Sequence, residues 1–88
     1  MQKLRKELIV VNGIKIKVTI NNVHAIVAKA ESFQSDIDLT YNHYIVDCKS
    51  FIAVTTMIGN KYCYVSINSN DEKEIERFNK EMEEFKCD

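Results

Sequence analysis

The sequence predicts an α+β fold, a two-layer open-faced α/β sandwich in which one antiparallel sheet carries three helices on one face. The first observation is the order of strand-like and helix-like apolar segments, which is ββαββαβα. The second is the pair of turn dipeptides at 12–13 and 42–43, each between two strand-like segments. The third is the length of 88 residues, which supports a single domain spanning residues 1–88. Helices scattered among antiparallel hairpins collect on one sheet face and leave the other open to water.

An amino-terminal hairpin is expected first. Asn12-Gly13 is a preferred type I′ turn dipeptide, and the residues on both sides of it are apolar or alternate between apolar and polar. We therefore expect strands at about 6–11 and 14–20. The strand at 6–11 is an extra strand that would bring the sheet to five strands.

The middle of the chain alternates helices with a second hairpin. Asn21-Asn22 end the first hairpin and offer a cap to an amphipathic helix over 23–33. Alternating apolar residues predict a hairpin over 37–46 that turns at Asn42-His43, where asparagine tolerates the left-handed conformation. Ser50 caps a second helix over 51–58, and Gly59-Asn60 end it.

The last third of the chain predicts one strand and one long helix. Residues 62–67 are rich in strand formers. Ser69 and Glu72 have the spacing of a capping box, which places the start of the last helix there. Its buried stripe is expected to be Ile75, Phe78, Met82 and Phe85, and its solvated faces to carry the i,i+4 pairs Glu76–Lys80 and Arg77–Glu81.

Composition and charge argue against several classes of function. Twelve Lys and Arg against thirteen Asp and Glu leave a net charge of −1, so no basic field is available to hold nucleic acid. Three cysteines without C-x-x-C spacing argue against a disulfide framework and a zinc site, and no metal or other cofactor is expected. The charged start of the chain and the lack of a long apolar run argue against a signal peptide and membrane insertion. We therefore expect a cytoplasmic protein.

The element order and residues 33–54 resemble HPr, the small histidine-phosphorylated carrier of the bacterial phosphoenolpyruvate:sugar phosphotransferase system. That family shows an aromatic residue, a Ser-acid turn, a hairpin, a Lys-Ser pair and an apolar helix in this order. The corresponding runs are Phe33-Gln34-Ser35-Asp36-Ile37 and Asp47-Cys48-Lys49-Ser50-Phe51-Ile52-Ala53-Val54. The resemblance covers most of the chain. It implies a four-stranded antiparallel sheet with three helices on one face, to which the strand at 6–11 would add an edge.

The family's phosphorylation motif is altered here. HPr carries its histidine in a Gly-hydrophobic-His-x-Arg-Pro-Ala run at the start of the first helix. The nearest run in this chain is Asn22-Val23-His24-Ala25-Ile26-Val27-Ala28, which makes His24 the candidate phosphate acceptor. Ile26 and Val27 stand where the family has arginine and proline. Because a phosphohistidine needs helix amides and a cation around its charge, we expect phosphorylation to be weakened or lost.

A second alignment removes the histidine from the motif altogether. An alignment without gaps, anchored at Phe33 and Ser50, places Thr19 at the position of the family histidine, more than one helical turn before His24. His24 then lies inside the first helix as an ordinary surface or cap histidine. Both alternatives stay open on the sequence.

Ser50 and the apolar residues after it form the second candidate site. The resemblance makes Ser50 a candidate for the regulatory phosphorylation of Gram-positive family members, although a plain N-cap is the simpler explanation. A two-turn helix cannot bury a nearly continuous apolar side, so part of it is expected to form a partner-binding patch. The candidate partner-binding residues are Lys49, Phe51, Ile52 and Val54.

Three functions are compatible with these residues. The leading hypothesis is an HPr-like regulatory or adaptor protein of the phosphotransferase system, with an altered phosphorylation site, that binds the system's protein partners. The second is an active phosphocarrier that relays a phosphoryl group through His24 to a sugar permease domain, which is a carrier and not a classical enzyme. The third is an unrelated protein-binding module that shares the fold. The partner, the sugar and the oligomeric state stay open.

Overall fold

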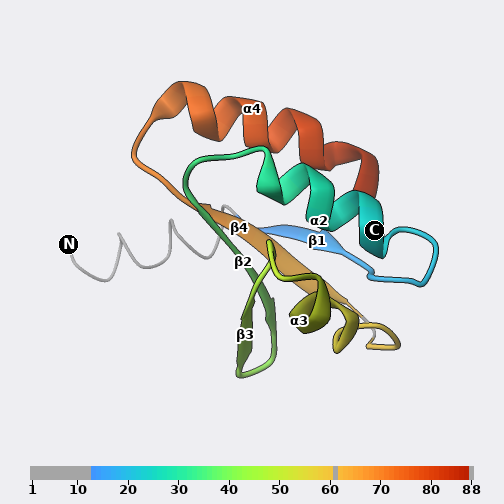
Figure 1. Ribbon diagram of the computed structural model, residues 1–88. Coiled ribbons are helices and arrows are strands. Elements are labelled where there is room, and N and C mark those ends of the chain that lie inside the picture. Colours follow the sequence, from blue (N-terminus) through green and yellow to red (C-terminus); the bar gives the residue numbers. More distant parts are fainter. Residues whose placement is uncertain (1–12, 61, 88) are drawn as a thin grey trace.

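The computed structural model describes residues 13–60 and 62–87, which form a four-stranded sheet with three α-helices (Figure 1). In chain order the elements are β1 (Ile14–Ile16), α2 (Val23–Glu31), β2 (Asp36–Tyr41), β3 (Tyr44–Asp47), α3 (Phe51–Thr55), β4 (Cys63–Asn68), α4 (Glu72–Met82) and the 3-10 turn η1 (Glu83–Phe85). All strand pairs are antiparallel, and the strand order is β1-β4-β2-β3. The predicted α+β class, with an antiparallel open sheet and three helices, is confirmed.

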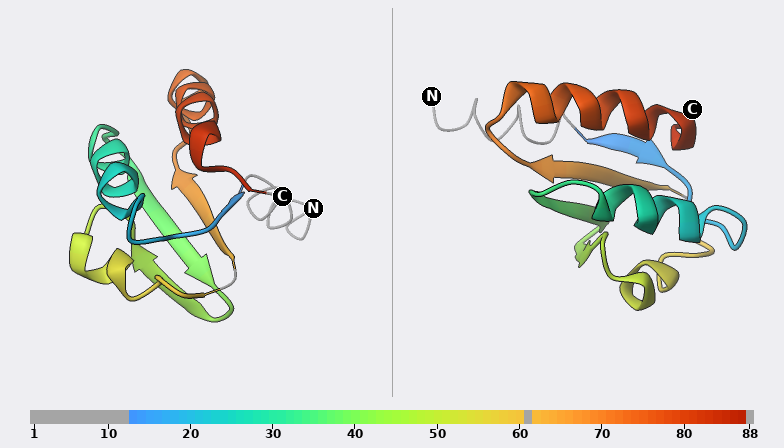
Figure 2. Two further views of the ribbon diagram at one scale, coloured as in Figure 1. Left: turned by 90° about the vertical axis from the view of Figure 1, so that its right-hand side faces the viewer. Right: turned by 45° about the horizontal axis from the view of Figure 1, so that its top comes forward.

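The helices lie on one side of the sheet. Figure 2 shows α2 and α4 side by side over one face, with α3 next to α2 near the β3 edge. Ile37 and Leu39 of β2 and Val65 of β4 point into the layer between sheet and helices and are completely buried. Phe78 of α4 closes this core, with its ring edge-on to Phe33 at a centroid distance of 5.7 Å.

The predicted amino-terminal hairpin is wrong in its second strand. The strand expected over 14–20 ends at Ile16, and its predicted partner at 6–11 lies outside the described residues. The early end has a local cause. The backbone N–H of Thr19 donates to Asn22 Oδ1 at 2.7 Å, and the N–H of Asn22 donates to Thr19 Oγ1 at 3.2 Å. These side-chain bonds replace the strand ladder with a turn, so Val18 is buried while Ile20 is exposed.

The carboxyl-terminal residues occupy part of the outer edge of β1. Ile16 pairs with Cys63 of β4 on one side and forms a bridge to Lys86 on the other. The backbone N–H of Cys87 donates to the carbonyl oxygen of Lys15 at 2.9 Å. Four strands of the sheet lie within the described residues, and the fifth strand that we expected, at 6–11, lies outside them.

Helix boundaries differ from the predictions mainly at the caps. Asn22 precedes α2, but its side chain turns back to Lys17, where its Nδ2 donates to the carbonyl oxygen at 2.8 Å, and makes no cap bond. α2 ends two residues before the predicted end at 33, and α3 ends at Thr55, three residues before 58. Asp71, and not Ser69, caps α4 by accepting a hydrogen bond from the N–H of Lys73 at 3.0 Å. The turn at Asn42 is confirmed, with φ at 54°.

Ser69 has a different role, which is to tie the α4 amino terminus to the turn after α2. Its hydroxyl donates to Glu74 Oε1 at 2.6 Å. The Ser35 hydroxyl donates to the same oxygen at 2.6 Å, and the Ser35 N–H donates to Glu74 Oε2 at 3.1 Å. Hydrogen bonds from the hydroxyls of Ser35 and then Ser69 lower the pKa of Glu74 from 4.5 to about 2.

Replacing Glu74 by Gln is expected to lower stability at neutral pH, and the difference from the parent chain should shrink in acid. The folded state stabilises the ionised carboxylate, so its contribution is present above pH 4.5 and is lost as the pH falls towards about 2. Urea midpoints of both chains across this range measure the effect, with Glu76→Gln on the exposed face of α4 as the control. A difference that stays constant over this pH range would contradict the role of the Glu74 carboxylate.

Candidate functional site

The amino-terminal ends of α2 and α3 meet on the surface of the molecule. His24 is the second residue of α2 and Phe51 is the first residue of α3. Their rings lie against each other with a centroid distance of 4.6 Å and an interplanar angle of 34°. The two candidate sites, 27 residues apart in the sequence, therefore form a single surface.

Apolar side chains dominate this surface. Ile20 and Ile52 are each 78% exposed, and Phe51 is 40% exposed. Ile20 lies in the turn that leads into α2, four residues before His24 in the sequence. We call Ile20, His24, Phe51 and Ile52 the α2–α3 surface. Exposed apolar side chains gathered around two helix starts are typical of a protein-binding site.

The sequence did not single out Ile20 as a surface residue. Its place in the alternation Ile14, Ile16, Val18, Ile20 assigned it to the buried side of a strand. The structure exposes it because the turn made by Thr19 and Asn22 ends the alternation. The available sequence signal was the polar pair Asn21-Asn22 directly after it, since such residues compete for backbone hydrogen bonds.

Thr19, the alternative position for the family histidine, is part of that turn. Its hydroxyl oxygen accepts the N–H of Asn22, and its carbonyl oxygen accepts the N–H of Val23. Its side chain therefore holds the approach to α2. His24 is exposed in the first turn of α2, and its ring has no hydrogen-bond or ion-pair partner among the described residues.

The position that carries the family's arginine supplies no cation here. In the motif alignment this position is Ile26, which is completely buried in the core. Lys29, the nearest basic residue along α2, pairs instead with Glu84 at 3.4 Å. The α2–α3 surface can bury apolar area against a partner. Because Ile26 is apolar and Lys29 is paired with Glu84, neither residue supplies a free cation for a phosphoryl group.

Ser50 caps α3 as predicted. It has an extended backbone, and its hydroxyl accepts the N–H of Ala53 at 3.4 Å. The Ser50 side chain is partly buried beside the α2–α3 surface. Phosphorylation of Ser50 stays a prediction.

Of the predicted partner-binding residues, Val54 is buried, and Lys49 is half-buried and already makes a hydrogen bond within the chain. Val54 is completely buried, because it lies on the side of the short helix α3 that faces the core. The Lys49 ammonium donates to the carbonyl oxygen of Phe33 at 2.7 Å, which ties the start of α3 to the end of α2. Phe51 and Ile52 remain as the exposed pair that the apolar pattern predicted.

The cysteines offer no activated nucleophile. Burial, and secondarily the carboxylate of Asp47, raises the pKa of Cys48 to about 12. Burial also raises the pKa of Cys63. Both side chains are packed as small apolar groups in the core, as the sequence suggested.

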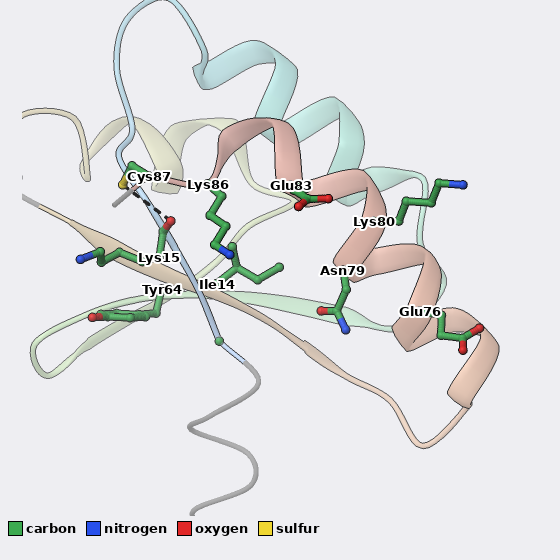
Figure 3. A pocket seen from close by; sticks show the side chains of 10 residues that line it. Ile14, Lys15, Tyr64, Glu76, Asn79, Lys80, Glu83, Lys86 and Cys87 are labelled. Carbon is green, nitrogen blue, oxygen red and sulfur yellow. Dashed lines mark hydrogen bonds between the residues drawn. The ribbon is translucent and has the colours of Figure 1, made fainter.

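A separate pocket lies elsewhere, along the outer edge of β1. It has a volume of about 890 Å³ and lies between β1, β4, α4 and the carboxyl-terminal residues (Figure 3). Acidic and basic side chains alternate along its α4 side: Glu76, Lys80, Glu83 and Lys86. None of the predicted site residues lines this pocket, so it adds nothing to the α2–α3 surface.

Metal sites and membrane-spanning helices are absent from the described residues. Within residues 13–60 and 62–87, no group of three His, Cys, Asp or Glu side chains could hold a metal ion. None of the helices in that part of the chain has the length and apolar character needed to cross a membrane. No protein-family model matches the chain, and no curated protein matches it either.

Proposed function

We propose that this chain is an HPr-like regulatory or adaptor protein of the phosphotransferase system, which binds a protein partner through the α2–α3 surface and carries no phosphoryl group on His24. The observation that carries the proposal is the contact of His24 with Phe51, together with the exposure of Ile52 beside Phe51 and of Ile20 in the turn before α2. Aromatic and aliphatic side chains at the centre of a surface supply most of the binding energy of protein interfaces.

The order of the elements also supports this proposal. A four-stranded antiparallel sheet with three helices is the fold that the resemblance to HPr implies. The family places its histidine and its regulatory serine at the starts of the first and second helices. In this chain, His24 and Ser50 lie at the starts of α2 and α3, and these two helices contact each other.

One observation favours the competing function, a working phosphocarrier. His24 is exposed and lies in the first turn of α2, where helix amides stabilise negative charge. Against it stand the buried Ile26 at the arginine position and the ion pair that occupies Lys29. A charge-assisted hydrogen bond of this kind contributes about 1.5–3 kcal/mol, so its loss is enough to cripple phosphoryl transfer.

Incubation with phosphoenolpyruvate and the first enzyme of the system, followed by intact-mass measurement, distinguishes the two functions. We expect the mass of the chain to stay unchanged, because the motif and α2 offer no free cation beside His24. Authentic HPr in the same reaction serves as the positive control. Stoichiometric, acid-labile phosphorylation that disappears in His24→Ala would contradict the proposal and establish the phosphocarrier.

A further inference from the structure

The face of the sheet away from α2 and α4 carries a row of side chains across all four strands. The strand register places Lys15 of β1 beside Tyr64 of β4, Tyr64 beside Thr40 of β2, and Thr40 beside Ile45 of β3. Cys63 and Val65, on either side of Tyr64 in the chain, are buried under the helices. Successive strand residues point to opposite faces, so Tyr64 and its neighbours in the row lie on the open face.

Two side chains of this row, Tyr64 and Ile45, are exposed and apolar or aromatic, while Lys15 and Thr40 are half-buried. Tyr64 is 49% exposed and Ile45 is 66% exposed. Tyr62, which is 41% exposed, extends the apolar area along β4. The ammonium of Lys15 lies over the Tyr62 ring at 4.6 Å from its centroid. Figure 3 shows Lys15 and Tyr64 projecting together, away from the labelled side chains of α4.

A second row on the same face is acidic. Asp38 of β2 is the register partner of Asp47 of β3, and Asp36 lies two residues before Asp38 on the same side of the strand. Burial, together with the charges of Asp36 and Asp47, raises the pKa of Asp38. None of these carboxylates forms an ion pair with a lysine or arginine among the described residues. Like charges opposite each other on a sheet are destabilising, so a basic partner would relieve them.

We propose that this open face is a second docking surface, occupied by an amphipathic helix of a partner protein whose apolar stripe lies on the Tyr64–Ile45 row and whose Lys or Arg side chains lie on the acidic row. The rows are two residues apart along the strands, about 7 Å. With Lys15 at its β1 end, this row crosses four strands, about 14 Å, which is the length of two to three helical turns. The proposal is independent of the α2–α3 surface, which lies among the helices.

A synthetic helical peptide tests the proposal, with leucines at helical spacing and lysines along one flank. Titrated into the isotope-labelled full-length chain, it should shift the NMR signals of Thr40, Ile45 and Tyr64 in a saturable way. A peptide with glutamate in place of each lysine is the matched control and should bind at least about tenfold more weakly. Equal binding of both peptides, or no binding of the lysine peptide, would overturn the proposal.

Variants of the chain then locate the binding. Tyr64→Ser is expected to weaken the peptide about tenfold, and Asp36→Asn combined with Asp38→Asn several-fold. Glu31→Gln, which removes an exposed acidic charge at the end of α2, should leave the affinity unchanged. Unchanged affinity in Tyr64→Ser would overturn the assignment to this face. None of these changes touches the α2–α3 surface, so a failure here leaves the proposed function intact.

The same NMR spectra would also detect two other possible occupants of this face. Shifts of the Tyr64 and Ile45 signals that depend on chain concentration, without peptide, would assign the face to a second copy of the chain. Shifts at these residues after replacement of Lys3, Arg5 and Lys6 by Glu in the full-length chain would assign it to the chain's own amino-terminal segment. Either result would overturn the proposal of a partner protein.

Discussion

Under the proposed function the chain binds the first enzyme of the phosphotransferase system, and the Ile52→Glu variant is expected to lose that binding while it keeps its thermal stability. Ile52 is 78% exposed in the free chain, so the substitution removes little from the core. Surface substitutions of this kind change stability by about 0.5 kcal/mol or less. In a docked complex, the carboxylate would be desolvated without a partner, at a cost of at least about 2 kcal/mol, which corresponds to about 30-fold in affinity.

Calorimetric titration measures the affinity, and a thermal scan measures the stability. Ile45→Glu is the matched control, because it makes the same change on the opposite side of the sheet, where Ile45 is 66% exposed. Phe51→Glu should also abolish binding, with some loss of stability, because its ring packs on His24. Retained binding in both Ile52→Glu and Phe51→Glu would contradict the α2–α3 surface. A collapse of stability in both would show that the two residues belong to the core.

The Phe78→Ala variant is expected to lose about 3–5 kcal/mol of unfolding free energy. Phe78 is completely buried and lies edge-on to Phe33, and the Arg77 guanidinium covers the same Phe33 ring at 4.0 Å. A domain of 88 residues has a total stability of about 4–13 kcal/mol. The variant should therefore lose a large fraction of the stability of the domain.

Urea denaturation of Phe78→Ala and of Asn79→Ala provides the comparison. Asn79 is the next residue on α4 and is exposed, so its replacement should change the unfolding free energy by no more than about 0.5 kcal/mol. Similar losses in the two variants would show that α4 contributes through its helix and not through the contact of Phe78 with the sheet.

The parts of the fold that could be predicted are those whose sequence pattern and turn chemistry agree. The hairpin of β2 and β3 combines alternating residues with Asn42, and the structure contains it with nearly the expected ends. The alternation of apolar and polar residues over 14–20 has no turn dipeptide of this kind at its carboxyl-terminal end. Val18 is buried, which is compatible with either a strand or a loop. The hydrogen bonds of the Thr19 and Asn22 side chains stabilise a turn after it, so the segment forms a loop.

The candidate site could be predicted only in its composition. The apolar pattern after Ser50 requires that some side chains be exposed, but it cannot distinguish Ile52 from Val54. That distinction depends on how the short α3 is oriented, which the bond from Lys49 to the carbonyl oxygen of Phe33 helps to fix across 16 residues of sequence. The contact of His24 with Phe51 likewise depends on how α2 and α3 pack. Such packing is set by the whole core and not by local pattern.

The most direct test of the account is an NMR titration of the isotope-labelled chain with the first enzyme of the phosphotransferase system, carried out without phosphoenolpyruvate. We expect saturable shifts or line broadening at Ile20, His24, Phe51 and Ile52, with little change at Tyr64 and Ile45 on the open sheet face. Shifts concentrated on that open face, or no interaction at protein concentrations at which authentic HPr binds, would contradict it.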